Sequence, residues 1–107
     1  MISESGNRSM NLVTSIYATT RQFPKEELCG LVSQMRRAAV SVPSNIAEGK
    51  GRSTDRDRAH FYFQARGSLL ELETQILIAQ QLNYIPPKEA EPLLQLSAEI
   101  GHAKCSG

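Results

Sequence analysis

The fold is decided by residues 34–52, which read QMRRAAVSVPSNIAEGKGR. Apolar residues recur every three or four positions through this stretch and the segment before it, which is the pattern of one helical face. They are Leu28, Leu31, Val32, Met35, Ala39, Val42 and Ile46. The pattern keeps its phase across Pro43, so we predict one helix over residues 25–48 that is kinked at this proline.

Proline is unusual inside a helix, because it removes a backbone hydrogen bond and costs about 3 kcal/mol at an ordinary interior position. Ser41 and Ser44 flank Pro43, and we expect a hydroxyl there to bond the carbonyl group that the proline frees. In the alternative interpretation, a helix ends near Ser41 and a second helix is capped at Asn45, with Glu48 three residues further on.

The flanking sequence predicts further helices over residues 9–22, 55–82 and 88–103. The expected inner faces are Met10, Val13, Ile16, Tyr17 and Phe23 in the first segment, and Ala90, Leu93, Leu94, Ser97 and Ile100 in the last. We expect a left-handed glycine cap at residues 49–51, and Ser53 or Thr54 as the cap of the third helix. Short connections and the lack of strand patterns predict an all-α, antiparallel up-and-down four-helix bundle, one domain over residues 1–107.

The third helix carries two apolar stripes. The first is expected to face the bundle, and its members are Phe61, Ala65, Ser68, Leu69, Leu72, Ile76 and Ala79. The second consists of Phe63, Leu70 and Leu77, which repeat every seven residues on the opposite face. Because a single bundle can bury only one of these faces, the second stripe favours an oligomer interface with another copy of the chain. Singly exposed leucines are common on protein surfaces, which is the simpler alternative.

Charge is distributed unevenly, although the formal net charge of the chain is only +1. Residues 36–66 contain seven Lys/Arg and three Asp/Glu, a balance of +4, whereas residues 67–107 contain two and five, a balance of −3. The candidate nucleic-acid-binding residues in the basic part are Arg36, Arg37, Lys50, Arg52, Arg56 and Arg58. With few aromatic residues nearby, we expect contacts to the phosphates of RNA or DNA with little reading of base sequence. Solvated helix faces and contacts between subunits are the alternatives.

A polar stripe runs along the second helix at spacings of three and four, through Gln34, Arg37, Ser41, Asn45, Glu48 and Arg52. We interpret it as a hydrogen-bond network to another helix, in the same subunit or a neighbouring one, with Arg66, Glu71 and Glu73 as candidate partners. Such a network fixes the register of packed helices without necessarily adding stability.

No set of residues predicts catalysis, so we expect a protein that is not an enzyme and has no cofactor. Glu71 and Glu73 point to different sides of a helix, and His60 and His102 lack the neighbours of a metal site. No segment resembles a signal peptide or a membrane helix. We therefore expect a cytoplasmic protein with reduced thiols and no membrane contact.

The assembled motifs resemble a bacterial four-helix bundle family first met as reading frames inside intervening sequences of 23S ribosomal RNA genes. The similar text is FPKEELCGLVSQMRRAAVSVPSNIAEGKGR, then FYFQARGSLLELETQI and LNYI, together covering most of residues 23–85. Within it, RRAAxSxPxNIAEG is not a general helix pattern.

The resemblance implies a four-helix bundle that assembles into a ring, most plausibly a homopentamer. Relatives include the accessory protein of diversity-generating retroelements, which binds a reverse transcriptase and nucleic acid through a basic surface. A nucleic-acid enzyme is therefore a further partner that the resemblance implies. Most members of the family have no established role, so the resemblance predicts the fold more sharply than the function.

Overall fold

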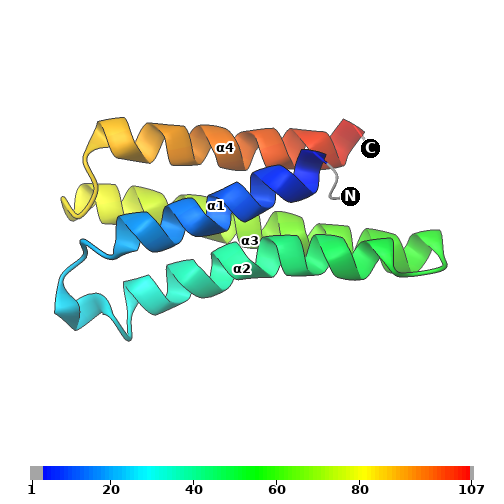
Figure 1. The fold of residues 1–107 in the computed structure, drawn as a ribbon, viewed down its shortest axis with the longest axis horizontal. Helices are drawn as coiled ribbons and strands as arrows, with labels where there is room; N and C mark the ends of the chain where they lie inside the picture. Colours follow the sequence, from blue (N-terminus) through cyan, green and yellow to red (C-terminus); the bar gives the residue numbers. More distant parts are fainter. Residues whose placement is uncertain (1–3, 107) are drawn as a thin grey trace.

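The structure is a computed structural model that describes the backbone of residues 4–106 and the side chains of residues 7–102. Its elements are α1 (Glu4–Thr20), a short 3-10 helix η1 (Lys25–Glu27), α2 (Leu31–Lys50), α3 (Asp55–Gln81) and α4 (Pro87–Ser106). The four α-helices run up and down beside one another, and no strand occurs in residues 4–106 (Figure 1). The predicted all-α, antiparallel bundle is confirmed.

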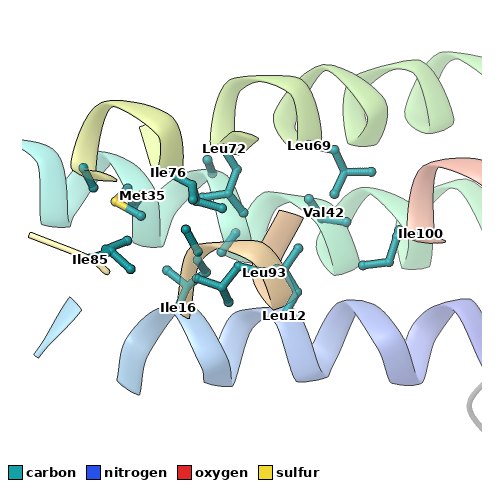
Figure 2. Close-up of a cluster of buried hydrophobic side chains, with 14 of the residues drawn as sticks. Leu12, Ile16, Met35, Val42, Leu69, Leu72, Ile76, Ile85, Leu93 and Ile100 are labelled. Atoms are coloured by element: carbon teal, nitrogen blue, oxygen red, sulfur yellow. The ribbon is translucent and has the colours of Figure 1, made fainter. Parts of the chain in front are cut away.

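Each α-helix packs against two others, so the order around the bundle is α1, α2, α3, α4 and back to α1. The bundle measures 43 × 25 × 23 Å. Figure 2 shows the shared core, to which all four helices and the α3–α4 connection contribute side chains. Its largest fully buried apolar residues are Leu12, Ile16, Met35, Val42, Leu72, Ile76, Ile85 and Ile100.

The inner face predicted for α1 has the wrong phase in part. Leu12 is fully buried, although it lies outside the predicted stripe, whereas Met10 and Tyr17 are exposed. Ile16 and Phe23 are buried as expected. The actual inner stripe of α1 contains two hydroxyl residues, Ser9 and Thr20, and a search for apolar periodicity does not register such positions.

The predicted start of α2 at residue 25 is wrong. Residues 25–27 form a single 3-10 turn, and the α-helix begins after Gly30, which serves as its N-cap residue. The carboxylate of Glu27 accepts a hydrogen bond from the backbone N–H of Leu31 at 3.1 Å. A side chain from the preceding turn therefore satisfies one of the free N–H groups at the start of α2. Leu28, assigned to the inner face, is 60% exposed because it precedes the helix.

Pro43 lies inside α2, which is continuous from Leu31 to Lys50. The alternative of two helices separated near Ser41 is therefore wrong, while the kink stays a prediction. The Ser41 hydroxyl bonds the side chains of Asn45 and Ser68 instead of taking the role expected for it beside Pro43. Val42 and Ile46 remain buried on the far side of the proline, so the apolar face passes through it without a shift.

The connection from α2 to α3 is short. Gly51 ends α2 in a right-handed conformation (φ −83°), so the predicted left-handed glycine cap is wrong. Thr54 caps α3 as predicted, because its side-chain oxygen accepts a hydrogen bond from the backbone N–H of Asp57 at 3.1 Å. Among the residues that the structure describes, the left-handed conformation is found instead at Asn83 (φ 65°), after α3. There Tyr84 N–H bonds Ala79 O and Asn83 N–H bonds Gln80 O, the two bonds of a Schellman cap.

Candidate interaction surfaces

The outer face of α3 carries large apolar side chains that the chain itself does not cover. Phe63 is 70% exposed, Leu70 56% and Leu77 48%; we call these three residues the α3 ridge. On the inner face of the same helix, Ala65, Leu69, Leu72, Ile76 and Ala79 are buried. The separation of α3 into an inner and an outer apolar face is therefore present in the structure as the sequence predicted.

Gly67 lies in the middle of α3, between Phe63 and Leu70 of the ridge. A Cβ atom added at Gly67 would meet no other atom within 4 Å. Glycine lowers helix stability by about 1 kcal/mol relative to alanine, and no packing constraint among the described residues calls for it here. Gly67 therefore leaves the backbone of α3 open to close approach from outside the subunit.

The predicted basic site divides into residues with different environments. Arg36 lies against α1, where its Nε donates to Thr20 Oγ1 at 2.9 Å and its Nη2 to the Tyr17 carbonyl at 3.4 Å. Its guanidinium group also lies over the Tyr17 ring, 4.6 Å from the centroid. A cation at the C-terminal end of a helix is favoured by the helix dipole. Arg36 thus ties α2 to the last turn of α1, within a single subunit.

Arg52 lies in the α2–α3 connection and Arg58 in the first turn of α3, and both have partners close by. Arg52 bonds Glu48 at 2.6 Å and stacks over the Phe61 ring at 4.7 Å. Arg58 pairs with Asp55 and donates to the Arg52 carbonyl at 2.9 Å. Since these pairs are solvent-exposed, they contribute little stability, but they neutralise part of the positive charge.

The remaining basic residues of the predicted site are Lys50, Arg56 and Arg37, and all three are exposed. Arg56 and Arg37 make no hydrogen bond or ion pair within the described part of the chain. Lys50 and Arg56 lie with Arg52 and Arg58 at the end of the bundle where α2 and α3 meet (Figure 1). Arg37 lies about four turns away along α2, so the structure does not bring all six predicted residues together.

The close approach of α2 and α3 at this end depends on Gly49, which is buried. A Cβ atom at Gly49 would lie 2.9 Å from Tyr62 Cε1 and 3.3 Å from Phe61 Cβ. The position of the α2–α3 connection is therefore fixed by tight contact between the end of α2 and the start of α3.

The polar stripe of α2 breaks into two local sets of contacts and a pair of residues beside a groove. Ser41 and Ser68 share a hydrogen bond of 2.8 Å between α2 and α3, and the Asn45 amide donates to Ser41 Oγ at 2.9 Å. Glu48 pairs with Arg52. Gln34 and Arg37 border an open groove of about 310 Å³ between α2 and α3, which Glu71 lines from the other side.

Two of the partners proposed for the stripe lie elsewhere. Arg66 and Glu73 line a hollow between α3 and α4, and Glu73 accepts a hydrogen bond from the buried Ser97 hydroxyl at 2.9 Å. Their positions on the helix turn them away from α2 of the same subunit, so they do not contact the stripe within one subunit. A contact of the stripe with a neighbouring subunit stays a prediction.

Sequence reasoning missed a larger groove between α1 and α2, with a volume of about 570 Å³. We call it the α1–α2 groove, and it is lined by Tyr17, Leu28, Val32, Ser33, Arg36, Arg37, Val40 and Ser41. Val40 is 39% exposed and Leu28 60%. In the sequence, this groove is indicated by Val40, an apolar residue outside the inner stripe of α2.

The structure also bears on metal binding and membrane insertion. Among the described residues, no group of three or more His, Cys, Asp and Glu side chains is placed to hold a metal ion. No helix in the described part of the chain is both long and apolar enough to cross a membrane.

Comparison with known proteins identifies the family of this fold. The family model described as 23S rRNA-intervening sequence protein matches residues 4–104. No curated protein matches the chain. A crystal structure from Bacteroides thetaiotaomicron, of a protein with unknown function from the S23 ribosomal protein family, superposes with a TM-score of 0.86. That likeness covers 95% of both chains at 19% sequence identity, so it concerns the fold alone.

Proposed function

This chain belongs to the family of 23S rRNA-intervening sequence proteins, and we propose that it acts as a homo-oligomeric, non-enzymatic scaffold assembled through α3. The observation that carries this proposal is the α3 ridge, in which three large apolar side chains lie in register on the outside of the bundle. Aligned exposed apolar residues are typical of a surface that another protein covers. The copy number that the family resemblance implies is five.

The mass of the protein in solution, measured by light scattering after size exclusion, tests this proposal. We expect the wild-type protein to be an oligomer and Leu70→Glu to be a monomer, because a carboxylate cannot be buried at the contact without a partner. Met10→Glu is the matched control, since Met10 is an exposed apolar residue on α1 (49% exposed) away from the ridge. A monomeric wild-type protein at high concentration would contradict the proposal.

A second candidate function is nucleic-acid or ribonucleoprotein binding at the α2–α3 connection. It is favoured by the gathering of Lys50, Arg52, Arg56 and Arg58 within nine residues at one end of the bundle. One subunit offers only a modest positive charge there, but several copies in an oligomer would present it repeatedly to a polyanion. A nucleic-acid enzyme could be recruited by the same assembly.

The exposed, free thiol of Cys29 fits the cytoplasm in which we place the protein.

The experiment for this second candidate is titration of structured RNA and of DNA at low and moderate salt. We expect affinity to fall steeply with salt, because phosphate contacts release counterions. The test variant is Arg56→Glu combined with Lys50→Glu, which leaves the pairs of Arg52 and Arg58 intact. The control is Arg21→Glu, an exposed arginine beyond the end of α1. Binding that is absent at low salt, or unaffected by the test variant, would exclude this function without affecting the assembly proposal.

A further inference from the structure

We infer that the α3 ridge of one copy packs into the α1–α2 groove of a second copy. The inference rests on the proposed assembly and adds which surface receives the ridge. The two surfaces belong to different parts of the subunit, so the contact is head-to-tail: each copy offers a ridge to one neighbour and a groove to another.

The two surfaces lie on opposite sides of the bundle. The order around the bundle places the pair α1 and α2 opposite the pair α3 and α4. Leu70 of the ridge also borders the hollow between α3 and α4, together with Ser97 and Gly101 of α4. The ridge is therefore turned toward the α3–α4 side, away from the α1–α2 groove. One copy can use both surfaces at once without its two neighbours meeting.

The groove is long enough to receive part of the ridge, and both surfaces carry exposed apolar side chains. From Phe63 to Leu77 the ridge spans about 21 Å of helix, and the α2 wall of the groove from Val32 to Ser41 spans about 14 Å. Leu28 extends the groove beyond the start of α2. The exposed apolar side chains of Leu28 and Val40 line it, so a ridge side chain placed there removes apolar surface of both copies from water.

Charge also favours this pairing over contact between two identical ridges. The α2 segment from residue 31 to 44 contains Arg36 and Arg37 and no acidic residue, a balance of +2. The α3 segment from residue 63 to 81 contains Arg66, Glu71 and Glu73, a balance of −1. Arg37 makes no ion pair with any described residue of its own subunit and lines the groove. A carboxylate beside Leu70 of the neighbouring copy would give it one.

A head-to-tail contact closes into a ring or continues as a filament, whereas contact of a surface with its own copy stops at a dimer. The two arrangements are distinguished by mixing variants that each damage one surface. Leu70→Glu damages the ridge and keeps the groove, while Val40→Glu damages the groove and keeps the ridge. We expect each variant alone to be monomeric. An equal mixture should form a dimer of one copy of each, because one intact ridge and one intact groove remain.

Circular dichroism and thermal melting of each variant establish that it is folded, and Leu28→Glu serves as a second groove variant outside the helix. If Val40→Glu and Leu28→Glu both assemble like the wild-type protein, the groove is not the receiving surface and this inference is overturned. The assembly proposal would then still stand on Leu70→Glu. If the mixture of ridge and groove variants remains monomeric, head-to-tail packing is overturned as well. A monomeric wild-type protein would overturn both.

Discussion

The Tyr84 hydroxyl donates a hydrogen bond of 2.9 Å to Glu27 Oε2, across 57 residues of sequence. The other oxygen of the same carboxylate, Oε1, accepts from the backbone N–H of Leu31 at the start of α2. The Tyr84 ring in turn packs against Phe23, with centroids 5.3 Å apart. One carboxylate therefore joins the turn before α2 to the α3–α4 connection, at the end of the bundle opposite the α2–α3 connection.

This contact predicts how stability depends on alkaline pH. The hydrogen bond to Glu27, together with burial and the negative charges of Glu27 and Glu26, raises the pKa of Tyr84 above its ordinary value. A group whose pKa is raised in the folded state contributes stability below its unfolded pKa and loses it as the pH rises through the folded pKa. We expect the contribution to be complete at neutral pH, to begin to fall as the pH passes about 10, the ordinary tyrosine pKa, and to be lost as the pH rises through the raised pKa of the folded state.

Ultraviolet titration of tyrosinate formation measures this shift directly. In Glu27→Gln the pKa of Tyr84 should fall toward its ordinary value, because the charge that opposes ionisation is gone. Tyr84→Phe identifies which step of the titration belongs to Tyr84 and should remove the corresponding alkaline loss of stability. An unchanged titration curve in Glu27→Gln would contradict the role of this carboxylate.

Two glycines of the bundle should respond in opposite ways to alanine. Gly49→Ala places a Cβ atom 2.9 Å from Tyr62 and 3.3 Å from Phe61. Crowding of this kind costs about 1–3 kcal/mol, which exceeds the gain of about 1 kcal/mol in helix propensity. Gly67→Ala meets no atom within 4 Å, so we expect it to stabilise the subunit by up to about 1 kcal/mol. Urea unfolding of both variants in the monomeric Leu70→Glu background compares them, and a stabilised Gly49→Ala would contradict the close approach of α2 and α3.

The Ser41–Ser68 hydrogen bond should couple α2 and α3 in a double-mutant cycle. Replacing either serine with alanine leaves the other hydroxyl without this partner, and we expect each change to cost about 1 kcal/mol. The double variant should cost less than the two single changes added together, since the second removes the group left unpaired by the first. Chemical unfolding gives all the values needed. Strict additivity would mean that this bond contributes nothing to the packing of α2 on α3.

The sequence predicted the parts of the fold that depend on periodicity. Val42 and Ile46 keep the phase of α2 through Pro43, and the two faces of α3 follow from spacing alone. Periodicity failed where polar groups determine the structure. Thr20 is buried because it bonds the Ile16 carbonyl and receives Arg36, and no apolar pattern identifies such a residue.

The boundaries that were predicted wrongly have similar causes. Pro24 with acidic residues behind it is a good first helical turn by local rules, yet the turn closes at Gly30 and the Glu27 side chain takes over the capping of α2. A left-handed cap was expected at a glycine after α2, but Gly51 is right-handed there, and the left-handed conformation is found at Asn83 after α3. For the candidate site, the pairs Arg52–Glu48 and Arg58–Asp55 follow from spacings of four and three residues. The contacts of Arg36 with α1 depend instead on how the two helices pack, which charge alone does not reveal.

Arg36 and Arg37 are adjacent in sequence and should behave as opposites. Arg36 donates to Thr20 and to the Tyr17 carbonyl and lies over the Tyr17 ring. We therefore expect Arg36→Ala to destabilise the subunit by about 1–2 kcal/mol. Arg37 makes no such contact within the described residues, so Arg37→Ala should change stability by less than about 0.5 kcal/mol. Urea unfolding in the monomeric Leu70→Glu background gives both values.

We also expect Arg36 and Arg37 to differ in role, Arg36 acting within the subunit and Arg37 between subunits. Arg36→Lys keeps the charge but loses the forked geometry that reaches both acceptors on α1, so it should recover only part of the lost stability. Arg37→Glu should weaken assembly of the otherwise wild-type chain while leaving the melting of the monomeric background unchanged, because its expected partner is a carboxylate of the neighbouring copy. If Arg37→Glu assembles normally and Arg36→Ala is as stable as its parent, the division of these two arginines between the inside and the outside of the subunit is wrong.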